Sequence, residues 1–157
     1  MKTLILMVAL SSTTPKPPAK QQDGFWIKQA AIATLHMVSG FLIYQNEVTT
    51  HNWYQYKLRH PNANPQWWWP RLSTNNKYKN GDPAQGPKFF GSTTFLVWTT
   101  DKYHLNRMLR NVFVAGGTAL CMTLWEKPRW QHIVLQLVTN WASYALGTGI
   151  GYWYYKR

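Results

Sequence analysis

The chain has 157 residues, which is enough for one domain but not for several. It carries 17 Lys and Arg against 5 Asp and Glu, for a formal net charge of +12, so we expect an anionic partner, either nucleic acid or a lipid surface. A single cysteine, Cys121, excludes an internal disulfide framework. The mean hydropathy of −0.37 argues against a chain wholly embedded in lipid and favours apolar helices joined to a large polar loop.

The N-terminal segment, residues 1–24, predicts an export signal followed by a linker. MKTLILMVALSS has one lysine, a short apolar run and small residues after it, which is the layout of a secretory signal. An N-terminus that only dips into the membrane is the alternative. The stretch that follows, to residue 24, is polar and rich in proline, as an extended linker is.

The rest of the chain, residues 25–157, is predicted to form a single all-α domain. We expect a small membrane or membrane-associated protein with three main helices, over about 25–60, 101–125 and 132–155, because a bilayer-spanning helix needs about 20 apolar residues. Ile133 to Tyr155 is the strongest predicted span: it has no formal charge and ends in aromatic residues before Lys156 and Arg157, as an interfacial anchor does.

The two C-terminal helices are predicted to form an antiparallel hairpin, because the link between them is short and contains Pro128. Small residues recur on both helices at a spacing of four. Such rows let two helix backbones approach closely, so we expect them to face each other. They are Ala115, Ala119 and Thr123 on the first helix and Ser143, Gly147 and Gly151 on the second.

The long loop, about 61–100, contains three consecutive tryptophans, Trp67, Trp68 and Trp69. Such a run could stack on nucleic-acid bases, lie at the lipid headgroups or cover a polar site. The apolar helices on either side favour packing at an interface, with Pro70 fixing the chain direction and Arg71 facing headgroups.

The segment NKYKNGDPAQG in the same loop predicts a tight turn, with Tyr78 and Asp82 in the aromatic-rich surface of the loop. Gly81 would supply a positive φ and Pro83 would end the turn. A calcium loop is the alternative, but the segment lacks the later acidic residue that such a loop requires.

Two of the few acids have a histidine one helical turn away: Glu47 with His51, and Asp101 with His104. Carboxylate and imidazole at this spacing share a helix face, and two such helices could supply four ligands to a divalent metal or an acid and base. A structural interpretation competes with this one. Asp101 stands where a helix would begin and could cap it, and Glu47 and His51 could form a surface pair.

Several of these motifs resemble an uncharacterised family of small exported or membrane proteins of Bacteroidota. They are PNANPQWWWP, NKYKNGDPAQGPKFFGSTTFLVWTTD and DKYHLNRML. The weaker similarity is to small bacterial lipoproteins with an Asp-Lys-x-x-His helix. The family brings no known activity, so the resemblance implies class and location only. The positions it singles out are Asn62, Asn64, Trp68, Pro70, Asn76, Lys77, Tyr78, Lys79, Asn80, Gly81, Asp82, Asp101 and His104.

Three functions are compatible with these patterns. The first is a structural or partner-binding protein of the bacterial inner membrane, whose partners are anionic headgroups, another protein or a second copy of the chain. An exported, periplasmic location is the alternative. The second is a metal-dependent membrane hydrolase that uses Glu47, His51, Asp101 and His104 with a divalent metal as cofactor. The third, a binder of single-stranded nucleic acid, is less favoured because no RNA-binding motif occurs.

Overall fold

The structure, a computed structural model, describes residues 22–125 and 127–156. The predicted signal and most of the predicted linker, residues 1–21, therefore lie outside the described residues. The described chain is all-α, as the sequence predicts, and holds no strand; one isolated antiparallel bridge joins Tyr78 to Pro87.

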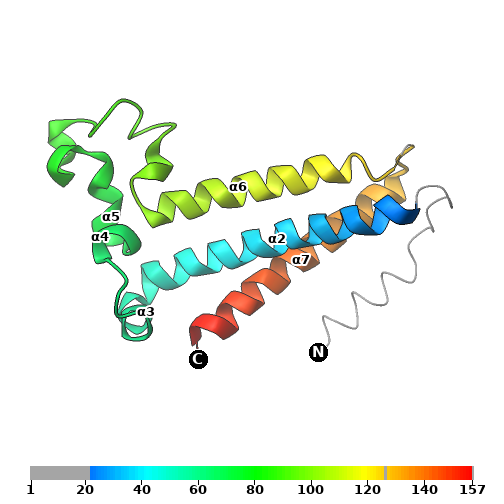
Figure 1. The fold of residues 1–157 in the computed structure, drawn as a ribbon, viewed down its shortest axis with the longest axis horizontal. Helices are drawn as coiled ribbons and strands as arrows, with labels where there is room; N and C mark the ends of the chain where they lie inside the picture. The colour runs from blue at the N-terminus through cyan, green and yellow to red at the C-terminus, as the bar shows by residue number, and fades with distance from the viewer. Residues whose placement is uncertain (1–21, 126, 157) are drawn as a thin grey trace.

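Three long helices form a bundle: α2 (Gln22–His51), α6 (Lys102–Cys121) and α7 (Trp130–Lys156). Both α6 and α7 pack along α2, as Figure 1 shows, and α6 runs antiparallel to it. The direction of α7 is parallel to α2, because Gly147 lies against Met37 near the middle of α2 whereas Tyr155 meets Gln45 nearer its end.

The remaining described elements form a cap, defined here as residues 52–101, at one end of the bundle (Figure 1). The single helix expected over about 25–60 is two helices, which join at Asn52 with φ −125° and ψ 37°. The cap consists of short turns of helix: α3 (Trp53–Arg59), α4 (Pro65–Trp68), α5 (Pro70–Ser73), η2 (Thr74–Lys77), η3 (Lys79–Gly81), η4 (Pro83–Gln85) and η5 (Val97–Thr99).

The two C-terminal helices run antiparallel, as predicted, but the prediction that their small residues face each other is wrong. Both α6 and α7 pack mainly along α2, with side contacts between them such as Asn140 Nδ2 to Cys121 Sγ at 3.5 Å. The small residues of α7 do serve a close approach, but their partner is α2. A Cβ added to Gly147 would overlap the backbone carbonyl of Met37, and one added to Gly151 would lie 2.9 Å from the Cβ of Tyr44. From the other side, a Cβ on Gly40 would overlap the carbonyl of Tyr144. The predicted row on α6 packs against nothing: Ala115, Ala119 and Thr123 are exposed.

The contact between α2 and α6 depends on a different glycine, Gly117, which the sequence analysis did not single out. The imidazole of His36 fills the space where a side chain at Gly117 would stand. His36 lies in the middle of α2, and its Nδ1 donates to the carbonyl of Ile32 at 2.9 Å, so the helix itself satisfies the buried ring. At the far end from the cap, Lys28 Nζ donates to the Thr123 carbonyl at 3.1 Å.

Among the described residues, one helix is long and apolar enough to cross a membrane, Gly24–His51 in α2. The prediction that Ile133 to Tyr155 is the strongest span is therefore wrong, because Gln136, Asn140 and several hydroxyl-bearing residues lower its hydropathy. A core helix of a soluble protein and a signal sequence pass the same test, and only about a quarter of the α2 window, 28%, is buried.

The cap and the bundle share one cluster of buried apolar residues. It contains Val48 from α2, Trp53 and Tyr56 from α3, Ala63 from the following turn and Tyr155 from the last turn of α7. Trp68 and Trp69 pack against its edge. The last turn of the chain therefore belongs to the same core as the first turn of the cap.

Candidate functional site

Asp101 and His104 form a buried pair at the point where the cap leads into α6. The Asp101 side chain is fully buried and accepts two hydrogen bonds from His104, from the backbone N at 2.9 Å and from Nδ1 at 2.7 Å. Thr100 Oγ1 also lies 2.9 Å from this carboxylate, and its one proton is shared with the Val97 carbonyl, 2.7 Å away. The bond from the backbone N of His104 caps the helix, so the capping interpretation of Asp101 is confirmed. Negative charge at this end also suits the helix dipole.

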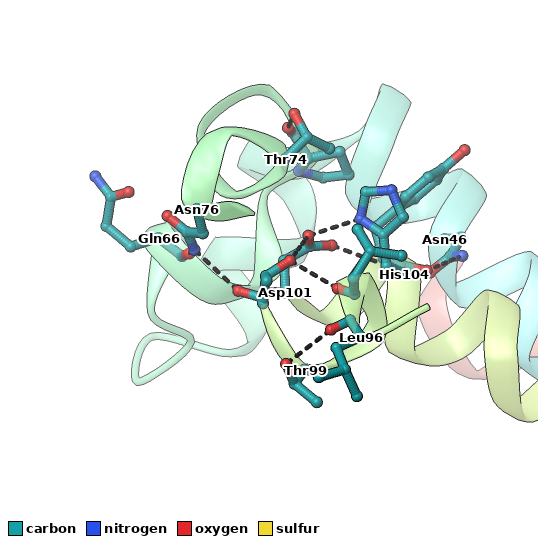
Figure 2. A network of polar contacts seen from close by, with 12 residues as sticks. Asn46, Gln66, Thr74, Asn76, Leu96, Thr99, Asp101 and His104 are labelled. Atoms are coloured by element: carbon teal, nitrogen blue, oxygen red, sulfur yellow. Dashed lines mark hydrogen bonds and ion pairs between the residues drawn. The ribbon is translucent and has the colours of Figure 1, made fainter. Parts of the chain in front are cut away.

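The His104 ring is held in one orientation by this carboxylate, and its side chain is 17% exposed. Because Asp101 accepts from Nδ1, the Nε2 atom is the basic nitrogen of the neutral ring. Such a pair can act as a general base where a hydroxyl or thiol donates to Nε2. The hydroxyl of Thr74, drawn with the pair in Figure 2, donates instead to the Pro70 carbonyl at 2.7 Å. The geometry therefore favours a structural role.

Asn76 fastens the cap to the same place. Its Nδ2 donates to the carbonyl of Gln66, at 2.5 Å, and to the carbonyl of Thr100, at 3.2 Å (Figure 2). One side chain thus joins the segment after α4 to the residue before Asp101. This explains in physical terms why an asparagine is needed there, since a carboxylate could not donate to either carbonyl.

The second predicted pair, Glu47 and His51, lies elsewhere and in a different environment. Its atoms are 3.4 Å apart, but the two side chains are 61% and 69% exposed, so water screens the interaction. Within residues 22–125 and 127–156, no group of three or more His, Cys, Asp or Glu side chains could hold a metal ion. The structure does not bring the four predicted ligands together.

The three tryptophans of the loop are half-buried, and two of them, Trp68 and Trp69, pack against other rings. Trp69 stacks on Trp53 with ring centroids 5.7 Å apart and an angle of 6° between the planes. Trp68 lies 5.7 Å from the Tyr56 ring, and the Lys102 ammonium lies over its other side at 5.1 Å. Pro70 is buried at the first position of α5, which turns the chain immediately after the tryptophans. These rings are engaged, so they do not form a free platform for bases.

The predicted turn in the loop is present. Gly81 has φ 75°, as expected, and Asn80 before it also has a positive φ, 52°. Asp82 begins η4 by accepting from Ala84 N at 2.9 Å, with Pro83 at the first position of that helix. The carboxylate of Asp82 is used to cap this turn, which supports the turn interpretation of the segment over the calcium loop.

Between α2 and α6 lies a group of buried carboxamides, here called the amide belt: Gln45, Asn46 and Asn106. Asn106 Nδ2 donates to Gln45 Oε1 at 2.8 Å and to Asn46 Oδ1 at 2.9 Å. Asn46 Nδ2 donates to the Tyr103 carbonyl, and Gln45 Nε2 donates to the hydroxyl of Tyr155. The belt could not be predicted from the sequence, because Asn106 lies about 60 residues from Gln45 and Asn46 and no local pattern connects them.

Where α3 meets the last turn of α7, aromatic residues line an open cavity of about 510 Å³, here called the junction cavity. Tyr56, Arg59 and His60 contribute to it from α3, Trp68 from α4, and Tyr154 and Tyr155 from α7. The Arg59 guanidinium reaches across the junction and donates to the backbone carbonyl of Tyr155. Of these residues, only Trp68 is among the predicted site residues.

No family model, curated protein or solved structure matches this chain. The arrangement of a bundle with a cap, and the chemistry of its junction, are therefore the grounds for a functional argument.

Proposed function

We propose that this protein is a small integral membrane protein with a structural or partner-binding role, in which the bundle crosses the bilayer and the cap lies on one membrane surface. The observation that carries the proposal is the outer face of α7. Apolar side chains there recur at helical spacing and point away from the bundle, as a lipid-facing helix requires.

This outer face, here called the α7 stripe, consists of six residues that are more than a third exposed: Trp130, Ile133, Val134, Leu137, Val138 and Trp141. Leu137 is 64% exposed and Trp141 67%. Water-soluble monomers rarely expose a continuous apolar surface of this extent. In the hydrocarbon of a bilayer, such an apolar face does not carry the free-energy cost of contact with water.

The interior of the bundle has the opposite character, which also supports the proposal. Many of its buried side chains are polar: His36, Ser39, Gln45, Asn46, Thr49, Asn106, Gln136 and Ser143. Between helices in a bilayer, polar side chains find partners that lipid cannot offer, and small residues allow close contact. The amide belt and Gly40, Gly147 and Gly151 fit both expectations.

The distribution of basic residues supports an orientation. Because α7 is parallel to α2, the cap and the C-terminal end of α7 lie on the same side. Nine basic residues fall in the cap and the first turns of α6, whereas the described residues at the opposite end supply Lys28, Lys127 and Arg129. The nine are Lys57, Arg59, Arg71, Lys77, Lys79, Lys88, Lys102, Arg107 and Arg110. The positive-inside rule then puts the cap in the cytoplasm, with anionic headgroups beside it.

Membrane extraction combined with cysteine labelling tests the proposal. In a Cys121→Ser background, a cysteine replaces either Leu137 in the α7 stripe or Lys79 in the cap. We expect both variants to stay with membranes in alkaline carbonate. In inside-out vesicles a membrane-impermeant maleimide should modify the Lys79→Cys variant and not the Leu137→Cys variant.

The detergent-solubilised protein is the matched control, because it separates protection of the cysteine by lipid from its burial inside the protein. Leu137→Cys should react with the maleimide once the lipid has been removed, and it should also react in the denatured chain. Release of the protein by carbonate, or equal labelling of the two variants in intact vesicles, would contradict the proposal. Labelling of Lys79→Cys in whole cells would show that the cap lies outside the cytoplasm.

A further inference from the structure

The junction cavity has the chemistry of an anion site. Of its lining residues, Arg59 carries a formal positive charge and none is acidic. The Arg59 side chain is placed by its bond to the Tyr155 carbonyl, which engages one of its terminal nitrogens. The other N–H groups of a guanidinium remain to form the two-pronged contact that carboxylates and phosphates accept.

The rim of the cavity is fixed by a second cation. Lys57 Nζ donates to the carbonyls of Pro61 and Ala63, at 2.6 and 2.8 Å, and so holds the turn that follows α3. Its charge also raises the positive potential at this end of the cap. The turn therefore keeps its shape without a ligand, and the cavity does not depend on binding to form.

Tyr56 supplies a hydrogen-bond donor inside the cavity. The residue is only 4% exposed, and it lines the cavity; its hydroxyl forms no hydrogen bond with the described residues and is not one of the buried polar atoms that lack a partner, so it reaches the solvent of the cavity. Burial, and next the neighbouring Tyr155 and Tyr154, hold the pKa of this phenol well above its usual value of 10.0, so the group keeps its proton at any physiological pH. A ligand oxygen that replaces water in the cavity can accept the hydrogen bond of this hydroxyl.

The walls of the cavity are aromatic and stacked. The His60 ring lies 4.5 Å from that of Tyr56 and 6.3 Å from that of Tyr154. Trp68 closes the opposite side, 5.7 Å from Tyr56. Such walls suit a ligand with a charged group at one end and an apolar body, and they suit a small, fully hydrated ion less well.

We propose that the junction cavity binds the phosphodiester headgroup of an anionic phospholipid, with the phosphate oxygens on Arg59 and the Tyr56 hydroxyl. This inference rests on the proposed function, because only a membrane-spanning bundle brings the cavity to the level of the headgroups. Exposed apolar side chains of α7, among them Ile150 and Tyr154, lead away from the cavity along the bundle and would accompany the acyl chains. A zwitterionic headgroup also carries an ammonium group, and no lining residue of the cavity offers a carboxylate to pair with it.

Binding of phosphatidylglycerol to the full-length protein in mild detergent, measured by native mass spectrometry, tests the proposal. The decisive variant is Tyr56→Phe, which removes one hydroxyl that forms no hydrogen bond with the described residues. We expect it to weaken binding about tenfold, the value of one hydrogen bond to a charged acceptor. Tyr54→Phe is the matched control: Tyr54 lies on the same helix, is 75% exposed and does not line the cavity, so its binding should equal that of the wild type.

Three further measurements decide between ligands. Arg59→Gln should abolish the preference for phosphatidylglycerol over phosphatidylcholine, with circular dichroism as a check that the fold persists. Equal binding of Tyr56→Phe and Tyr54→Phe, or equal affinity of the wild type for the two lipids, overturns the proposal. So does displacement of phosphatidylglycerol by an equal concentration of inorganic phosphate, which would mark the cavity as a site for the free ion.

Failure of this inference and failure of the proposed function are distinguishable. Tyr56→Phe should remain in the carbonate-resistant membrane fraction while losing affinity for the headgroup. A protein that fractionates with the membrane but shows no headgroup preference refutes the cavity assignment alone. A protein released by carbonate refutes the membrane assignment whatever it binds in detergent.

Discussion

The bundle and the cap are made from the same kinds of residue but place them in opposite ways. In the bundle, apolar side chains such as Leu137 and Trp141 point outward while carboxamides such as Asn106 lie inside. In the cap, Trp53 and Tyr56 lie in the core and Lys79 and Arg71 lie on the surface, together with the exposed rings of Phe90 and Phe95. In the proposed membrane protein, this contrast means that each region meets a different solvent and that the joint between them contacts both.

The two regions also differ in what holds them together. Helices of the bundle touch through glycine contacts with little side chain between them, whereas the cap is fixed by single polar side chains that join distant backbone groups. Loss of one contact should therefore have different effects in the two regions. The experiments below compare them, in order of decreasing expected effect.

Asp101→Ala should cause the largest loss, about 4 kcal/mol of unfolding free energy, since it removes a helix cap and leaves buried donors unsatisfied. Thermal unfolding in mild detergent measures the loss, and limited proteolysis within residues 52–101 should accelerate. Asp82→Ala is the control, because Asp82 caps a short exposed turn; it should cost about 1 kcal/mol or less. Equal losses in the two variants would contradict the importance assigned to burial.

Gly147→Ala should loosen the bundle and spare the cap. The added Cβ overlaps the Met37 carbonyl, so α7 must move away from α2, at a cost of about 2 kcal/mol. Gly149→Ala is two residues away on the same helix and meets nothing within 4 Å. Since alanine is the better helix former, that variant should be neutral or slightly more stable. If both glycines tolerate alanine equally, the close approach of α2 and α7 is wrong.

Asn76→Ala should weaken the cap by about 1 kcal/mol, the net worth of a hydrogen bond or two, without loosening the bundle. Amide hydrogen exchange should quicken between residues 66 and 100 and stay unchanged in α7. Asn75→Ala serves as the neighbouring control, because the Asn75 side chain is exposed and only its backbone carbonyl is used. Identical exchange in the two variants would argue against the bridging role of Asn76.

Glu47→Gln should have the smallest effect, less than about 0.5 kcal/mol, because its partner His51 is exposed and the pair is screened by water. This result can be compared directly with that of Asp101→Ala, because Asp101 also pairs with a histidine but is buried. A loss of metal binding or of stability as large as that of Asp101→Ala would reopen the four-ligand site.

Local features of this fold could be predicted from the sequence because they depend on neighbours in the chain. The helix cap at Asp101 and the turn at Gly81 are determined by residues within three or four positions. The all-α class likewise follows from long apolar segments without strand patterns. Each of these needs only backbone geometry and a nearby partner, and the structure contains all three.

The packing partners could not be predicted in the same way. The spacing of Gly147 and Gly151 indicates that something approaches closely, but it does not say which helix, and the short link to α6 suggested the wrong one. The candidate site changed for a similar reason: Glu47 and Asp101 share a type of partner but not a location. Arg59 and Tyr56 carried no local motif, and the junction cavity arises only when the last turn of α7 reaches α3.

Tyr155 has a consequence for how the protein is made. It belongs to the core that Trp53, Tyr56 and Ala63 build in the cap, yet it is synthesised only after α6 and nearly all of α7. The core of the cap is therefore complete only when the end of α7 has been made. A chain that stops short of α7 lacks Tyr155, and its cap would have an incomplete core.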